Sequence, residues 1–131
     1  MQNKCLTLLI LLFCLSTSCK NDEKNNAEFI LKEGNKLFNS INCIQCHSLE
    51  GEKLYGPPLN SILEKTITVE RADNKIINLV VNRDYIYRGI KNPNFEKATE
   101  YSKSIMPVPQ ISEEQINILT DYIVLINKKV E

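Results

Sequence analysis

The sequence has one histidine, two methionines, no excess of charge and no apolar run long enough to cross a membrane. Sixteen basic residues balance sixteen acidic ones, which gives no support for nucleic-acid binding. The longest apolar stretch, residues 6–15, is too short to span a bilayer. A zinc site normally needs four Cys or His ligands, so a single histidine also limits that chemistry. The chemistry of the chain therefore depends on few residues.

The single histidine directly follows a Cys-x-x-Cys pair, in the run Cys43-Ile44-Gln45-Cys46-His47. This is the attachment pattern of c-type haem. Each thiol adds to one vinyl group of the porphyrin, and the two intervening residues span the distance between the vinyls. The adjacent histidine then falls under the iron as an axial ligand. The motif predicts one covalently bound haem c.

Two other kinds of site use a Cys-x-x-Cys pair. A redox-active disulfide is expected in a βαβ context, which the sequence does not show. A structural zinc site would need a carboxylate to complete it, because the other cysteines, Cys5, Cys14 and Cys19, all lie near the N-terminus. A zinc or disulfide module remains as an alternative to haem.

The N-terminal residues resemble a bacterial export signal that ends in a lipid-attachment cysteine. Lys4 precedes the apolar stretch, and small residues lead to Cys19 in the manner of a lipoprotein signal. We expect residues 1–18 to be a signal peptide and Cys19 to be acylated. An ordinary secretory signal would instead leave Cys19 as a free thiol, which is a liability in an oxidising compartment.

After removal of the signal, 15 basic and 16 acidic residues remain, a formal charge of −1. Residues 19–26 are polar and charged, and we expect them to form a flexible tether. Residues 27–131 are enough for one domain, whose small core a covalently held apolar cofactor would help to complete.

Periodicity predicts helices at the two ends of this domain. Residues 27–40 carry an apolar stripe that includes Gly34, which indicates a close helix crossing. Ser112 and Gln115 form a capping box before a helix over residues 113–128. Between these helices we expect a short helix at 60–65 and a β-hairpin from strands at 66–69 and 76–81. A further helix is expected to be capped by Asn82 and stopped by Gly89 and Pro93. Residues 92–110 are expected to form an irregular loop.

The second axial position of the iron has several candidate ligands: Met106, a lysine, a tyrosine, or none. Met106 is the only methionine outside the predicted signal. His/Met ligation raises the reduction potential and closes the iron to small ligands, which favours electron transfer. An open sixth site would indicate a haem enzyme or a gas sensor instead.

The chain from Ala27 onward resembles class I cytochromes c. The matching pieces occur in family order: Gly34 and Phe38, Cys43-x-x-Cys46-His47, Gly56-Pro57-x-Leu59, Met106-Pro107, and Leu119, Tyr122 and Ile123. The resemblance implies an all-α cytochrome c fold, here with a small β-hairpin insertion near 66–81. It also implies that the first and last helices cross near Gly34, that the Pro57 carbonyl accepts a hydrogen bond from His47, and that Met106 is the distal ligand.

A narrower similarity is to the cytochrome domain of haem–copper oxidase subunit II. It rests on Asp84-Tyr85-Ile86, Ile90, Pro93, and Tyr101 before Met-Pro. Because the copper-binding part of subunit II is absent, we expect a stand-alone electron carrier and not an enzyme, with Tyr101 donating to a haem propionate.

We further expect a membrane-anchored lipoprotein that faces the bacterial periplasm. Its redox partners would be a terminal oxidase, a denitrification reductase or a quinol-oxidising complex.

Overall fold

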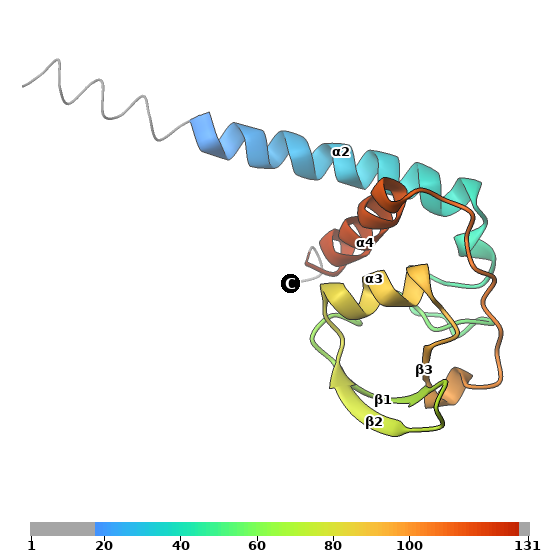
Figure 1. Ribbon diagram of the computed structural model, residues 1–131. Coiled ribbons are helices and arrows are strands. Elements are labelled where there is room, and N and C mark those ends of the chain that lie inside the picture. The colour runs from blue at the N-terminus through green and yellow to red at the C-terminus, as the bar shows by residue number, and fades with distance from the viewer. Residues whose placement is uncertain (1–17, 129–131) are drawn as a thin grey trace, which may run out of the picture.

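The computed structural model describes residues 18–128. In this part of the chain, three α-helices accompany a three-stranded sheet (Figure 1). The helices are α2 (Ser18–Ser40), α3 (Arg83–Lys91) and α4 (Glu113–Lys128); the strands are β1 (Thr66–Arg71), β2 (Ile76–Val80) and β3 (Glu96–Ala98); short 3₁₀ helices occupy Cys43–Gln45 (η1) and Thr99–Tyr101 (η2).

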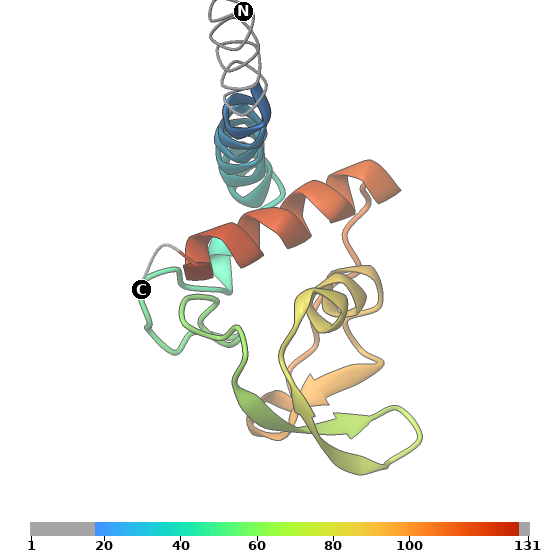
Figure 2. The same cartoon turned by 90° about the vertical axis from the view of Figure 1, so that its left-hand side faces the viewer.

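The helices α2 and α4 cross each other (Figures 1 and 2), and at their contact Gly34 of α2 faces Tyr122 of α4. A Cβ atom on Gly34 would lie 2.3 Å from Tyr122 Cβ, closer than atoms can approach. Beside this point, the rings of Phe38 and Tyr122 pack with centroids 6.1 Å apart. The predicted close crossing at Gly34 is confirmed, because only glycine leaves room for the Tyr122 side chain.

The last helix forms as its sequence predicts. Ser112 Oγ accepts from the Gln115 N–H at 3.2 Å, and Gln115 Oε1 accepts from the Ser112 N–H at 2.9 Å. These reciprocal bonds are the predicted capping box. The apolar face of α4 is buried with Phe38 and the buried side of α3, so that the core lies where these three helices meet.

Residues 60–65 form turns and not the short helix predicted from their sequence. Ser61 and Glu64 have φ angles of 52° and 63°, which an α-helix does not allow. Asn127 of α4 accepts hydrogen bonds from the Ile62 N–H at 2.7 Å and from the Leu63 N–H at 3.3 Å. A distant side chain thus satisfies backbone donors that a helix would otherwise have to pair.

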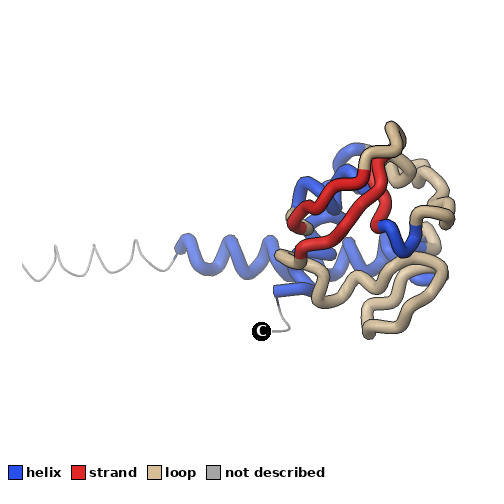
Figure 3. The backbone as a smooth tube through the Cα atoms, turned by 90° about the horizontal axis from the view of Figure 1, so that it is seen from below, coloured by secondary structure: helices blue, strands red, loops and turns tan. Residues whose placement is uncertain are grey.

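The predicted hairpin is present, and it belongs to a slightly larger sheet. β1 pairs antiparallel with β2 on one side and with β3 on the other, and Val69 lies opposite Ile77 and Ala98 (Figure 3). β3 lies in the stretch that was predicted to be an irregular loop. The fold therefore contains a three-stranded sheet, where an all-α fold with only a two-stranded hairpin was predicted. The strand has only three residues, too few to show an alternating pattern.

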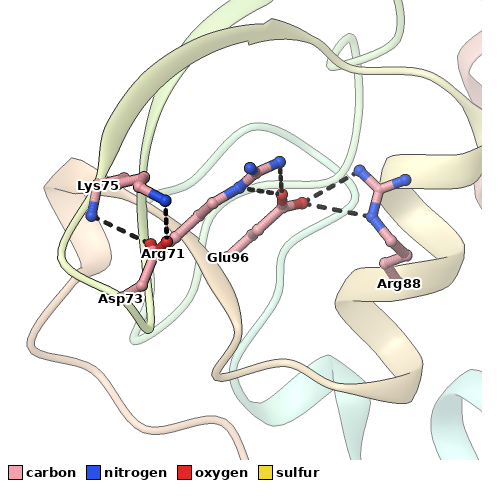
Figure 4. Close-up of polar contacts among 5 residues, drawn as sticks. All are labelled: Arg71, Asp73, Lys75, Arg88 and Glu96. Carbon is pink, nitrogen blue, oxygen red and sulfur yellow. Dashed lines mark hydrogen bonds and ion pairs between the residues drawn. The ribbon is translucent and has the colours of Figure 1, made fainter.

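A buried carboxylate joins this sheet to α3 (Figure 4). Glu96 on β3 accepts from Arg71 of β1 at 2.6 Å and from Arg88 of α3 at 3.1 Å, while only 4% of its side chain is exposed. A second ion pair, Lys75 with Asp73 at 2.8 Å, lies at the exposed turn of the hairpin. Glu96 therefore ties three elements together at one point.

Two helices differ in extent from the prediction. α2 begins at Ser18, so residues 19–26 are helical where a flexible tether was expected, and Figure 1 shows this end of α2 projecting beyond the rest of the fold. No proline or glycine interrupts the chain from Ser18 to Glu33. α3 is capped by Asn82 as predicted, at 2.9 Å from the Tyr85 N–H, but it continues through Gly89 and ends before Pro93.

Most of the predicted signal peptide, residues 1–17, lies outside the described residues, as does the side chain of Cys19. Within residues 18–128, no helix combines the length and the apolar character needed to cross a bilayer.

The Glu96 cluster makes stability depend on pH. Burial raises the pKa of the Glu96 carboxyl, but the hydrogen bonds from Arg71 and Arg88 outweigh burial, and the pKa is lowered on balance. A lowered pKa stabilises the fold above the unfolded-state pKa of about 4.3, and this stability is lost as the pH falls through the folded-state pKa.

We expect Glu96→Gln to lower the free energy of unfolding by about 1–3 kcal/mol at pH 7, because two guanidinium groups lose a charged acceptor. Urea denaturation at pH 7 and below pH 4 measures this effect, and the difference between wild type and variant should shrink in acid. Glu100→Gln is the control, since Glu100 is 70% exposed in its ion pair with Lys53 and should change stability by less than about 1 kcal/mol. An equal loss for Glu96→Gln at both pH values would contradict the argument.

Candidate cofactor site

The described residues form a large, partly open apolar cavity of about 680 Å³. This volume is within the range of about 300–1,000 Å³ that is typical of cofactor and ligand sites. Core side chains of all three helices form part of the wall, among them Phe38, Ile86, Ile90, Leu119 and Ile123. Such a wall excludes water and suits a flat apolar ligand.

Every residue predicted to bind the cofactor lines this cavity. They are Cys43, Cys46, His47, Pro57, Tyr101 and Met106. The first four come from η1 and the loop that follows it, whereas Tyr101 and Met106 come from η2 and the loop before α4. The structure thus brings together two segments that are far apart in the sequence.

The cysteine pair sits on a tight turn. Asn42 has a left-handed conformation with φ of 64°, which ends the helical path, and η1 follows at once. The Cys46 and His47 N–H groups both donate to the Cys43 carbonyl, at 3.1 and 2.9 Å. This single turn of backbone presents two thiols and an imidazole to the same cavity.

The two thiols are unsuited to a redox-active disulfide. Both cysteines are free and partly buried. Burial raises the pKa of the Cys43 thiol, the neighbouring Cys46 raises it further, and together they outweigh a backbone hydrogen bond that lowers it. Reactive Cys-x-x-Cys pairs have a lowered thiol pKa instead. The raised pKa of Cys43 therefore does not favour the disulfide alternative.

The imidazole of His47 is held in one orientation. Its Nδ1 lies 2.8 Å from the Pro57 carbonyl oxygen, the contact that the family resemblance implies. Nδ1–H donates in this hydrogen bond, so Nε2 keeps its lone pair. Burial lowers the pKa of His47, and the opposing effect of the Pro57 hydrogen bond is smaller. The ring is therefore neutral at pH 7, as a metal ligand must be.

Gly56 is required by the position of this ring. A Cβ atom on Gly56 would lie 2.5 Å from His47 Cε1. The Gly56 N–H donates to the Cys46 carbonyl at 2.9 Å, which keeps the loop against the motif. The sequence shows the Gly-Pro pair, but the packing of glycine against the imidazole is visible only in the structure.

Three further side chains contact the segment around Met106 and have no local sequence signal. Asn94, Lys97 and Tyr55 donate to or accept from backbone atoms of the segment around Met106. Their partners lie five to fifty residues away in the chain. Periodicity and short motifs report only on near neighbours, so these contacts were not predicted.

The donor set does not suit zinc. In the described part of the chain, no three side chains of His, Cys, Asp or Glu are grouped so that they could hold a metal ion. An apolar cavity with two free thiols and one neutral imidazole fits haem c much better, because the porphyrin needs apolar walls, two thiol attachment points and an axial nitrogen.

This fold and this site define a c-type cytochrome. The sequence model of the family described as "Cytochrome c" matches residues 31–126, most of the chain, and the protein belongs to the cytochrome c family. A comparison with curated proteins returns no match. Members of this family carry covalently bound haem c and transfer electrons, so this chain binds one haem c.

Replacing both cysteines, Cys43→Ser with Cys46→Ser, should abolish covalent attachment. The thioethers cannot form without the thiols, although the cavity and His47 remain. A haem-stained denaturing gel and a pyridine haemochrome assay measure the loss. Lys36→Ala on the outer face of α2, where the side chain is 76% exposed, serves as the control and should retain full haem content. Haem that still migrates with the double variant would contradict attachment at this motif.

Proposed function

We propose that this cytochrome is a one-electron carrier whose haem iron is ligated by His47 and Met106. The observation that carries the proposal is that both residues line one cavity, with the His47 ring and the Met106 backbone each held by a hydrogen bond. His47 is held by the Pro57 carbonyl, and the Met106 carbonyl accepts from Asn94 Nδ2 at 3.1 Å.

Haem iron supplies the chemistry, since it alternates between ferrous and ferric states. The chain supplies the surroundings. Two axial side chains would close both faces of the iron to small ligands, and a thioether ligand raises the reduction potential. The buried walls from α3 and α4 keep the site at low dielectric. These features favour electron transfer over the binding of a substrate or a gas.

The narrower similarity to the cytochrome domain of oxidase subunit II has support from the position of its motif. Tyr85, Ile86, Ile90 and Pro93 all line the cavity, and so does Tyr101. Tyr101 is only partly exposed, a setting in which a tyrosine hydroxyl needs a hydrogen-bond partner. We propose that this partner is a haem propionate.

We also propose that the carrier is a lipoprotein, tethered through Cys19 to a bacterial membrane and facing the periplasm. The support is the sequence of the predicted signal. A tethered carrier would exchange electrons with a membrane-bound or periplasmic partner such as a terminal oxidase, a denitrification reductase or a quinol-oxidising complex. α2, whose outer residues 22–26 are exposed, would separate the haem domain from the lipid.

Met106→Ala tests the ligation. The variant should lose the near-infrared methionine–iron band of the ferric protein, its reduction potential should fall, and its reduced form should bind carbon monoxide rapidly, because the sixth position opens. Val108→Ala, in the same loop and 50% exposed, should change none of these properties. Unchanged spectra in Met106→Ala, or rapid carbon monoxide binding by the wild type, would favour an open sixth site.

Cys19→Ala tests the anchor. When the producing cells are grown with labelled palmitate, the wild-type protein should carry the label. Mass spectrometry should place a diacylglyceryl group on an N-terminal Cys19. The variant should carry no label, whereas Cys14→Ala, which removes a thiol inside the predicted signal, should be labelled like the wild type. An unlabelled wild-type protein would indicate an ordinary secretory signal.

A further inference from the structure

The segment that carries Met106 has little support of its own. Between the end of η2 at Tyr101 and the start of α4, the chain forms no regular helix or strand. Pro107 and Pro109 lack an N–H group and cannot contribute a backbone donor. The position of Met106 must therefore depend on contacts from elsewhere in the fold.

Asn94 makes the first of these contacts. It lies in the turn between α3 and β3, and its Nδ2 donates to the Met106 carbonyl at 3.1 Å. The bond reaches the backbone of the proposed ligand itself. The turn directly follows the C-terminus of α3, whose apolar side chains are packed in the core. The contact therefore connects the Met106 backbone to a helix that the core holds in place.

Tyr55 makes the second contact, from the loop that follows the haem-attachment motif. Its hydroxyl accepts from the Ile105 N–H at 3.2 Å. Tyr55 precedes Gly56 and Pro57, which hold His47. One loop therefore contacts the histidine on one side and the residue next to Met106 on the other.

Lys97 makes the third contact. Its ammonium group donates to the Ser102 carbonyl and, at 3.1 Å, to the Ser104 carbonyl. Lys97 belongs to β3, and the neighbouring Glu96 ties that strand to β1 and α3 (Figure 4). The ammonium group thus fastens the start of the Met106 segment to the sheet, with charge-assisted hydrogen bonds that are stronger than neutral ones.

We propose that Asn94, Tyr55 and Lys97 are positioning residues that together hold Met106 on the iron and set how readily another ligand displaces it. The three come from a turn, a loop and a strand, so three separate parts of the fold restrain the segment. This proposal rests on the proposed ligation by Met106. It also gives the small sheet a role, as the support for the distal side of the cofactor.

The test uses the full-length haem protein and imidazole as the competing ligand. Asn94→Ala, Tyr55→Phe and Lys97→Met should each raise the affinity of the ferric protein for imidazole about two- to tenfold, the factor expected for one lost hydrogen bond. The double variant Asn94→Ala with Tyr55→Phe should raise it further and weaken the near-infrared methionine band. Asn92→Ala, two residues from Asn94 and exposed, is the matched control.

Amide hydrogen exchange gives an independent measurement. Tyr55→Phe removes only the acceptor of the Ile105 N–H, so exchange at Ile105 should accelerate while exchange in α4 stays unchanged. A circular dichroism spectrum and a haem content equal to those of the wild type establish that each variant is folded.

The possible outcomes separate the two proposals. If Met106→Ala leaves the near-infrared band unchanged, the ligation is wrong and the positioning role fails with it. If Met106→Ala abolishes the band but the three positioning variants bind imidazole like Asn92→Ala, the ligation stands and the positioning role is overturned. Tighter imidazole binding in the positioning variants alone, with Asn92→Ala unchanged, supports both.

Discussion

The site depends on the contact between His47 and the loop at Gly56 and Pro57. The Pro57 carbonyl fixes the orientation and tautomer of the imidazole, and the missing side chain of Gly56 lets the loop approach the ring. Such a hydrogen bond strengthens metal binding, because it makes the histidine ligand more basic and prevents its ring from rotating. Burial favours the neutral form of the same ring. One carbonyl and one glycine therefore set the orientation of the ring, and burial favours its neutral form.

The two sides of the cavity are supported by different means. On the histidine side, the loop is held by backbone hydrogen bonds to the motif, such as the Gly56 N–H to the Cys46 carbonyl at 2.9 Å. On the side of Met106, the support comes through side chains on the turn after α3 and on β3. Glu96 is important there because it anchors β3 to β1 and α3 with a carboxylate that water hardly reaches. The sheet therefore stabilises the less regular half of the site.

Much of the fold could be predicted because its signals are local. The capping box at Ser112, the Asn82 cap and the hairpin each depend on residues within a few positions of one another. Residues 60–65 were mispredicted because Asn127, far away on α4, pairs with their backbone and permits left-handed angles at Ser61 and Glu64. The strand β3 was missed because it has three residues and is held by a buried ion pair. The residues of the site were predicted from family motifs, whereas the side chains that hold the Met106 segment have no local signature.

An electron carrier works best when its ligands move little between oxidation states, because any reorganisation adds to the barrier for transfer. Under the proposed ligation, Tyr55 contributes to this rigidity on both sides of the haem. It belongs to the loop that fixes His47, and its hydroxyl restrains the residue before Met106. A displacement of the distal segment would therefore strain the proximal loop as well. If Met106 is the distal ligand, one short loop would couple the two axial ligands, and this coupling would limit their movement although the distal segment is rich in proline.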